Sequence, residues 1–228
     1  MKCNIVIFIV SALLLMMAPG CKTAKLSEAN AQYDRGEYNN AAKTYRAVYN
    51  KMTKREQRPQ RGEIAYKMGL CYDKLSMSSR ASAAFQNAIR YQYPDSTAIL
   101  LLAKAQQQEG QYKAAIANYE KYLELDSESV LARDGIRGCE QAMRNKNNPT
   151  RYVVKPAKIF NSRRSDFAPM FLGTDYDQLY FTTTNEKATG THRSEITGMK
   201  RSDIFFSKKN AQGVWQRPEP AQVSLTSE

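Results

Sequence analysis

Residues 65–72 read Ala-Tyr-Lys-Met-Gly-Leu-Cys-Tyr, and they are followed by Ala81, Phe85 and Ala88. The last three residues are four and three positions apart, which places them on one face of a helix. Within the quoted stretch, Met68 and Tyr72 have the same helical spacing. The two segments together predict a pair of amphipathic helices joined by a short turn.

The pattern of the second helix occurs three times in the chain. The step from Ala81 to Ala115 is 34 residues, and the step from Ala41 to Ala81 is 40 residues, so six residues are inserted into the first connection. A fixed period of this size is typical of stacked helical repeats. The three sets are Ala41, Tyr45 and Val48; Ala81, Phe85 and Ala88; and Ala115, Tyr119 and Tyr122.

The turns within the repeats show the same periodicity. Gly36 and Gly110 each precede a tyrosine by two positions, and glycine permits the backbone conformations that tight turns need. The middle repeat has Ser76 and Ser78 in place of the glycine and the tyrosine. This organisation resembles the tetratricopeptide repeat, a helix-turn-helix unit of 34 residues, and predicts an all-α solenoid over residues 29–146.

Residues 130–144 form one further amphipathic segment, with apolar Leu131, Ile136, Cys139 and Met143. No partner segment follows it, so it is expected to be the helix that caps the solenoid.

The resemblance implies a concave groove that binds an extended segment or a helix of a partner protein. The groove residues expected from the repeat pattern lie on the first helix of each unit and mix polar with apolar side chains. A solvated helical face is the alternative interpretation of each of these positions. They are Glu63, Tyr66, Leu70, Asp73 and Lys74 in one unit, and Leu100, Lys104, Gln107 and Gln108 in the next.

The inserted stretch carries an excess of positive charge, and we call its cations the basic ridge: Lys51, Lys54, Arg55, Arg58 and Arg61. An acidic protein, an anionic envelope polymer or anionic lipid headgroups would complement this charge. Nucleic acid is not an expected partner, because no aromatic residues alternate with the cations and the N-terminal sequence, described below, indicates export from the cytoplasm.

Two cysteines fall in the repeat frame. Ala31, Cys71, Ala105 and Cys139 occupy one equivalent helix position. Cys71 and Cys139 are two repeats apart, on the order of 20 Å, and a disulfide needs Cα atoms within about 7 Å. Both are therefore predicted to be buried, reduced packing thiols rather than metal ligands or redox groups.

The N-terminus reads as an export signal over residues 1–20. Lys2 is followed by an apolar run at residues 5–17, which is too short to span a membrane, and then by Ala18, Pro19, Gly20 and Cys21. A cysteine at this position resembles the lipobox of bacterial lipoproteins, in which Cys21 becomes the lipidated first residue and residues 21–28 a tether. An ordinary signal peptide near an unmodified Cys21 is the alternative.

The chain changes character near Asn147. Beyond a linker at residues 147–158, β-branched and aromatic residues alternate with turn formers and predict strands at 167–172, 178–183, 203–208 and 213–216. The order of these strands and their sequence motifs resemble one WD-like blade of a β-propeller, as in proteins of the TolB type, over residues 159–228. Asp166 and Asp203 are expected to hold turns. The fold class is therefore α+β and multi-domain, with a solenoid followed by the first, incomplete blade of an all-β propeller.

Propellers use about four to eight blades, and one blade is predicted here. We therefore expect that the native chain is longer than these 228 residues.

The composition gives little material for catalysis. The 228 residues include 34 Lys and Arg against 22 Asp and Glu, a net charge of +12, with 42% hydrophobic residues, which is ordinary for a folded protein. His192 is the single histidine and there are four cysteines, so catalytic triads and multi-histidine metal sites are not expected. No cofactor is expected either. The alternative is the adaptor part of a propeller-containing periplasmic glycan- or peptide-processing enzyme, for which the loop residue His192 would be the one candidate.

The combination of lipobox, repeats and blade resembles envelope lipoproteins that continue into an OmpA-like peptidoglycan-binding domain, some of them associated with type IX secretion. The resemblance implies a non-enzymatic scaffold, lipid-anchored in the outer membrane and facing the periplasm. Its partners would be periplasmic and outer-membrane proteins, and peptidoglycan would be reached only through a domain absent from these residues.

Overall fold

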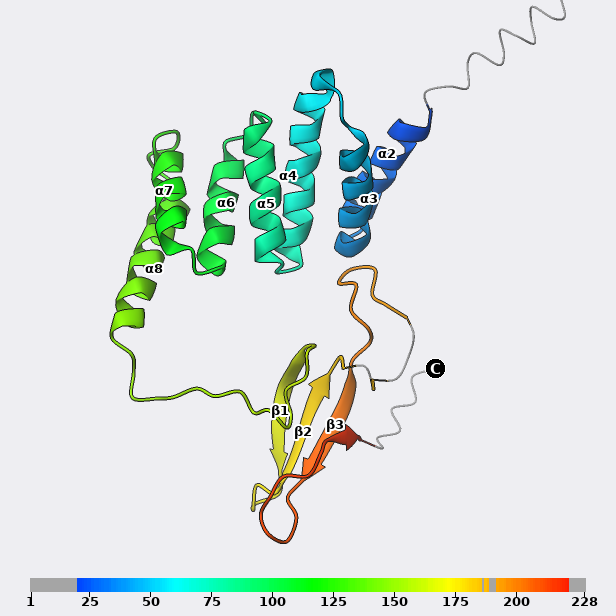
Figure 1. Ribbon diagram of the computed structural model, residues 1–228, viewed down its shortest axis with the longest axis vertical. Helices are drawn as coiled ribbons and strands as arrows, with labels where there is room; N and C mark the ends of the chain where they lie inside the picture. The colour runs from blue at the N-terminus through cyan, green and yellow to red at the C-terminus, as the bar shows by residue number, and fades with distance from the viewer. Residues whose placement is uncertain (1–19, 186, 189–191, 222–228) are drawn as a thin grey trace, which may run out of the picture. The chain divides into compact units, whose positions relative to one another are not determined.

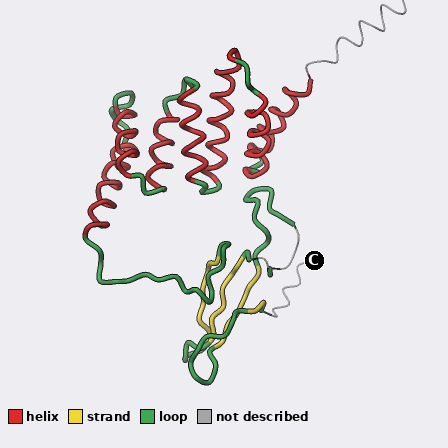
Figure 2. Tube along the Cα trace, in the orientation of Figure 1, coloured by secondary structure: helices red, strands yellow, loops and turns green. Residues whose placement is uncertain are grey.

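The computed structural model describes residues 20–185, 187–188 and 192–221. Their contacts divide the chain into two units between Pro149 and Thr150, a point that lies inside the expected linker. The first unit is helical and the second contains an antiparallel sheet, as Figures 1 and 2 show. Helices followed by strands are the order that the sequence pattern predicts.

In the helical unit each helix packs on the next one along the chain, and Figure 1 shows them side by side in chain order. The sequence explains this arrangement, because each helix has an apolar stripe that one neighbour alone cannot cover. The elements are α2 (Gly20–Asp34), α3 (Tyr38–Lys51), the short 3-10 helix η1 (Arg55–Gln57), α4 (Arg58–Lys74), α5 (Ser78–Arg90), α6 (Thr97–Gln108), α7 (Tyr112–Leu123) and α8 (Val130–Asn147).

All nine residues of the three repeated sets are buried, so the predicted helical faces are confirmed. Tyr45 and Phe85 are among the largest fully buried side chains. Phe85 of α5 lies against Gly69 of α4, where an added Cβ would come within 2.6 Å of the ring. The small residues of the first helices therefore make room for the aromatic residues of the second helices.

The first helix begins earlier than the sequence predicts. Residues 21–28, expected to be a tether, lie in α2, which starts at Gly20. Ala29 is fully buried, and Leu26, one turn before it, packs on the same core. The apolar face thus continues toward the N-terminus, which explains why the helix does too.

The capping helix α8 is present, but its buried face differs from the expected one. Leu131 is 71% exposed, whereas its neighbour Ala132 is fully buried. Gly135 and Cys139 complete the buried face. Apolarity alone favours leucine for the interior, but the space beside α7 admits only small side chains, and the structure corrects the prediction accordingly.

The turns between the two helices of each repeat share one backbone geometry. Gly36, Ser76 and Gly110 all have positive φ, at 78°, 54° and 75°. In each case the amide of the following residue donates a hydrogen bond to the carbonyl five residues earlier, as in a Schellman motif. Ser76 therefore occupies a position that glycine fits without steric cost.

We expect Ser76→Gly to raise the free energy of unfolding of the helical unit by about 0.5–1 kcal/mol. The left-handed conformation costs an L residue about 1–2 kcal/mol, which exceeds the extra entropy that glycine has in the unfolded chain. Urea unfolding followed by helical circular dichroism measures the change. Gly110→Ser is the matched control and should destabilise by a similar amount; equal stability of both variants and the parent would contradict the argument.

The second unit contains the strands β1 (Asp166–Leu172), β2 (Gln178–Thr183), β3 (Asp203–Lys208) and β4 (Glu219–Pro220), paired antiparallel in that order. Three strands match their predicted positions, but the fourth does not. Residues 213–216, predicted as a strand, follow a turn at residues 211–212 and form a single bridge, between Lys209 and Trp215. The sheet is open, and within the described residues it does not close into a propeller.

The sheet unit has a small hydrophobic core of Leu179, Phe181 and Phe205, with Phe160 and Trp215 packed against it.

Asp166 holds the turn before β1, as predicted. Its carboxylate accepts hydrogen bonds from the Ser162 amide at 2.6 Å and from the Thr183 hydroxyl at 2.6 Å.

Candidate protein-binding groove

Every second helix of the solenoid contributes to one layer. Side chains of α4 contact side chains of α6, and α6 contacts α8. Of the nine predicted groove residues, six are half-buried and three, Lys74, Lys104 and Gln108, are exposed, so each borders solvent. The first-helix layer expected from the repeat pattern is therefore formed, and we call it the groove.

Tyr66 lies at the junction of two repeats rather than free in the groove. Its hydroxyl shares a hydrogen bond of 2.9 Å with the Thr97 hydroxyl of α6. Its ring stacks on Tyr93, with centroids 4.5 Å apart and planes 23° from parallel. These contacts hold α4 against α6, so Tyr66 shapes the groove more than it offers a free surface.

Asp73 and Lys104 form an ion pair across the groove floor, with Lys104 Nζ 3.1 Å from Asp73 Oδ1. Asp73 is largely covered while Lys104 is about half exposed. A pair of this exposure contributes modestly to stability, at most about 1 kcal/mol. It fixes the lysine over the groove, where its ammonium can also meet a carboxylate of a partner.

Glu63 pairs with Lys67 one turn later, at 3.0 Å. Lys67 also donates to the Asn30 amide oxygen of α2 at 3.2 Å, and the Tyr45 hydroxyl donates to the same oxygen at 2.7 Å. This network joins α2, α3 and α4, so Glu63 too is committed to an intramolecular contact.

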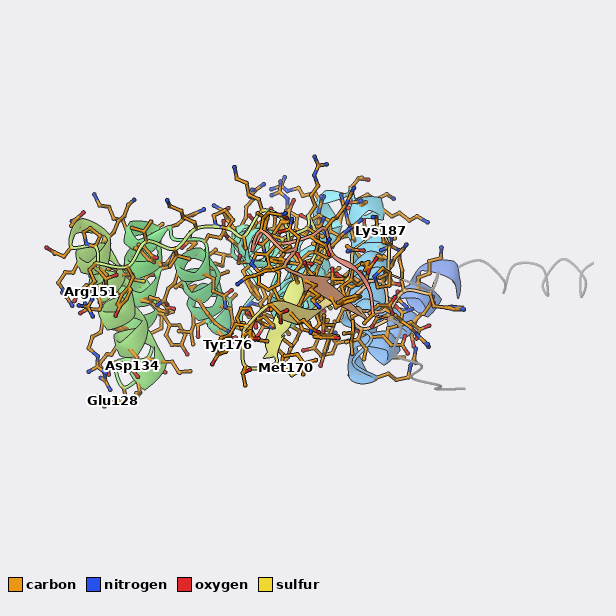
Figure 3. The ribbon with its side chains drawn as sticks, turned by 90° about the horizontal axis from the view of Figure 1, so that it is seen from below. Glu128, Asp134, Arg151, Met170, Tyr176 and Lys187 are labelled. Atoms are coloured by element: carbon orange, nitrogen blue, oxygen red, sulfur yellow. The ribbon has the colours of Figure 1, made fainter. Side chains whose placement is uncertain are left out.

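A pocket of about 420 Å³ opens between α6, α7 and α8. Its apolar walls come from leucines on α6 and α8, and polar groups lie at its edge. Asp134 is one of these and lies exposed on α8 (Figure 3). Its carboxylate is ion-paired with Arg137. The pocket is lined by Leu100, Leu101, Lys104, Gln107, Tyr119, Leu131, Asp134 and Gly135.

The inner wall of the pocket is fixed by Tyr119. Its hydroxyl donates a hydrogen bond of 2.7 Å to the Gln107 side-chain oxygen, and its ring lies directly against Gly135, where no Cβ would fit. Burial raises the pKa of the Tyr119 hydroxyl to about 12, so it stays a donor throughout the physiological range. The pocket is thus preformed by residues that are already paired.

Three predicted groove residues, Leu100, Lys104 and Gln107, line this pocket. Leu70 packs on the core, and Lys74 and Gln108 lie exposed at the ends of their helices. The sequence analysis missed Leu131, Asp134 and Gly135 as site residues. One indication was present in the sequence of α8. Leu131 and Ala132 are consecutive, so only one of them can face the core, and the other is left at the surface.

The basic ridge is formed except for Arg61. Lys51, Lys54, Arg55 and Arg58 are exposed. The Arg61 guanidinium instead lies 4.3 Å from the ring centroid of Tyr49 and donates to the Met52 carbonyl at 2.8 Å. Arg61 therefore holds the inserted loop in place, which corrects its assignment to the exposed ridge.

The two repeat cysteines are fully buried, as predicted, in different parts of the helical core. Burial raises the pKa of the Cys71 thiol to about 12 and also raises the pKa of Cys139. High thiol pKa values make both groups poor nucleophiles.

The remaining predictions concern the N-terminal residues, His192 and possible metal or membrane sites. Residues 1–19 lie outside the described residues, and Cys21 is described only as part of the backbone of α2. His192 is exposed. In the described part of the chain no three potential ligands gather as a metal site, and no helix there has the length and apolarity to cross a membrane.

Helical hairpins stacked with this period, and a groove along their first helices, define a helical-repeat protein. The family model for the tetratricopeptide repeat matches residues 63–96 and 97–129, so the chain contains tetratricopeptide repeats. Such repeats indicate a scaffold for protein–protein interaction, and their fold is typically non-enzymatic.

Solved structures similar to this chain include other tetratricopeptide-repeat proteins. The first such domain of human RPAP3 is 19% identical, with a TM-score of 0.47 over 58% of this chain and 100% of that one. The Sgt2 domain from Aspergillus fumigatus is 24% identical, with a TM-score of 0.45 over 62% and 93%. A repeat protein from Parabacteroides merdae is 19% identical, with a TM-score of 0.47, and the match spans 57% of this chain and 49% of that one. No curated protein matches the chain.

Proposed function

We propose that this protein is a non-enzymatic scaffold that binds a segment of a partner protein along the groove, with one apolar side chain of the partner in the α6–α7–α8 pocket. The observation that carries the proposal is the pocket itself. It has room for a large apolar side chain, and Leu131 at its rim is 71% exposed. Burying a leucine contributes about 1.5–3 kcal/mol, so covering Leu131 would make a large contribution to the free energy of partner binding.

The charged residues at the edge of the pocket would orient a bound segment. Lys104 and Asp134 stand at the edge of the pocket, and each is already ion-paired within the chain. A partner segment with an apolar residue flanked by charged residues would match this pocket. Its charged side chains could replace the present partners of Lys104 and Asp134, which are at the solvent-exposed rim.

The setting that we propose is the periplasmic face of the outer membrane, with Cys21 carrying the lipid anchor. The lipobox, the repeats and the blade-like sheet resemble the type IX secretion component PorE, in which such a chain links the machinery to the cell envelope. Its partners would then be periplasmic or outer-membrane proteins of that machinery. Contact with peptidoglycan would belong to a domain outside these residues, and a propeller completed by further sequence would give a second platform.

Leu131→Asp tests the pocket. The tagged native protein is purified from detergent-solubilised membranes, and mass spectrometry quantifies the chains that accompany it. We expect at least a tenfold loss of the specific partner, because the variant puts a charge at the pocket rim where an apolar contact is needed. The fold should be unaffected, since Leu131 makes little use of the core.

Leu125→Asp is the matched control, because Leu125 is 62% exposed in the turn before α8 and does not line the pocket. It should keep the partner at the level of the unmodified chain. Equal partner recovery by both variants would count against the pocket as the docking site. The intact mass of the purified chain shows at the same time whether acyl chains are attached at Cys21.

A further inference from the structure

The fold brings two basic features of the sequence to one end of the helical unit. Helices α2, α3 and α4 pack in succession, and each runs opposite to the one before it. The start of α2, the end of α3 and the start of α4 therefore lie at the same end, as Figure 1 shows. Cys21 belongs to the first turn of α2, and the basic ridge joins α3 to α4.

The ridge presents its charge outward. Lys51, Lys54, Arg55 and Arg58 are exposed, and within the described part of the chain none of them forms an ion pair. Glu56 is the one acidic residue between positions 51 and 58. Exposed cations without carboxylate partners keep their full attraction for an external anionic surface.

The ridge is also held in a fixed shape. The Arg61 guanidinium lies over the rings of Tyr49 and Tyr91, with distances of 4.3 and 5.2 Å to their centroids. The same group hydrogen-bonds the Met52 carbonyl within the inserted loop. These contacts tie the inserted loop to α3 and to the end of α5, since a cation–π contact is stronger where the cation is shielded from water.

We propose that the ridge cations Lys51, Lys54, Arg55 and Arg58 bind the anionic phospholipid headgroups of the membrane that holds the Cys21 anchor. The inference rests on the lipidation included in the proposed function. Acyl chains and a basic patch are complementary membrane signals, and each basic residue near an anionic surface strengthens binding about fivefold. The lipid fixes one point of the helical unit, and the ridge makes a second contact that sets its orientation.

This orientation has a consequence for the partner. The turns at Gly36, Ser76 and Gly110 lie at the opposite end of the helices and would point away from the membrane. The first helices would then stand with their axes pointing away from the lipid surface, so the groove across them would run parallel to the membrane and stay accessible to a partner from the aqueous side.

A lysine footprint on the whole lipidated protein tests the contact. The protein is reconstituted into vesicles of phosphatidylcholine alone or of phosphatidylcholine with 30% phosphatidylglycerol, and mass spectrometry follows amine modification. We expect Lys51 and Lys54 to react at least threefold more slowly on the anionic vesicles, with the protection lost in 0.5 M salt. Lys113 and Lys146, which are exposed near the opposite end, should react equally on both. Equal rates at Lys51 and Lys54 on the two vesicle types would overturn the proposal.

A charge-matched pair of variants separates the ridge from charge in general. Changing Lys51, Lys54, Arg55 and Arg58 to glutamine should remove the phosphatidylglycerol-dependent protection of α2 residue Lys25, an exposed lysine in the first helix. Changing Lys43, Lys113, Arg144 and Lys146 to glutamine removes the same charge and should leave that protection intact. Identical footprints for the two variants would refute a specific role of the ridge.

Failure of the anchor can be told apart from failure of the ridge. If intact mass shows no acyl chains, the lipidation is wrong, and flotation of the same chain with the two vesicle types tests the ridge alone; the four-glutamine ridge variant should then bind about 10²–10³-fold less tightly to the anionic vesicles. Partner binding, read with Leu131→Asp, is independent of both results.

Discussion

Phe85→Ala is expected to lower the free energy of unfolding of the helical unit by about 3–5 kcal/mol. Phe85 is fully buried in the larger helical core, and its ring lies against the bare backbone of Gly69 and 5.9 Å from the centroid of Tyr66. Truncation leaves a cavity between α4 and α5 that rigid helices do not close. Urea unfolding followed by helical circular dichroism measures the loss.

Two further variants locate the effect. Phe171→Ala makes the same chemical change at a side chain that is 52% exposed, and it should leave helical unfolding unchanged. Gly69→Ala should destabilise by about 1–3 kcal/mol through overpacking, because its Cβ would lie 2.6 Å from the Phe85 ring. In the double variant the added methyl group fills part of the cavity, so the combined loss should be smaller than the sum. Additive losses would mean that the two residues do not share a packing site.

The same packing explains how much of the helical fold the sequence could predict. Residues such as Ala81, Phe85 and Ala88 recur with a fixed period, and the period is a direct consequence of stacking one hairpin on the next. At α8 the prediction counted Leu131 among the apolar residues of the amphipathic helix, whereas the structure buries Ala132 and exposes Leu131. The tight fit of Tyr119 against this helix is a tertiary contact, and no local pattern contains it.

The sequence predicts where the candidate site lies, but not which of its residues are free to contact a partner. Lys104 and Gln107 line the pocket as residues of the expected groove, whereas Tyr66 and Asp73 are engaged with α6. Sequence spacing identifies which residues share a helix face. It does not show which of them find partners on the next repeat, because that depends on the distance and rotation between helices.

The fourth strand shows the same limit in the sheet. Residues 213–216 have the composition of a strand, but the Asn210 side chain accepts hydrogen bonds from the amides of Gln212 and Val214 and folds the segment into a turn. Beyond the turn the Gln216 amide still donates to the Lys208 carbonyl of β3, and a regular strand forms only at Glu219 and Pro220. Side-chain capture of backbone amides competes with strand pairing, and apolar alternation does not reveal it.

Raising the pH above about 9 is expected to destabilise the helical unit by about 1.4 kcal/mol per pH unit through Cys71 alone. Burial raises the pKa of this thiol from about 9 to about 12, so the unfolded chain loses the proton first and the folded chain keeps it. The folded state then binds more protons than the unfolded state, and stability falls as the pH rises. The contribution is fully present below pH 9.

Urea unfolding at pH 8, 9, 10 and 11 measures this loss, which should reach about 2.7 kcal/mol at pH 11. Cys71→Ala removes this thiol, so the stability of the variant at pH 8 should be lower but should fall less steeply between pH 9 and 10; the remaining decline comes in part from Cys139, whose pKa burial also raises. Above pH 10 the Tyr119 hydroxyl, with its pKa raised to about 12, adds to the decline in both proteins.

Cys139→Ala distinguishes burial of one particular thiol from a general effect of alkali. Cys139 is also fully buried, in the smaller helical core with Tyr119, and this variant keeps Cys71 and should keep the steep loss between pH 9 and 10. Parallel pH curves for the parent and Cys71→Ala would show that the Cys71 thiol ionises equally in the folded and the unfolded chain. That result is incompatible with a Cys71 side chain fully buried on α4. A thiol that stays protonated in the fold has a structural role in the helical core.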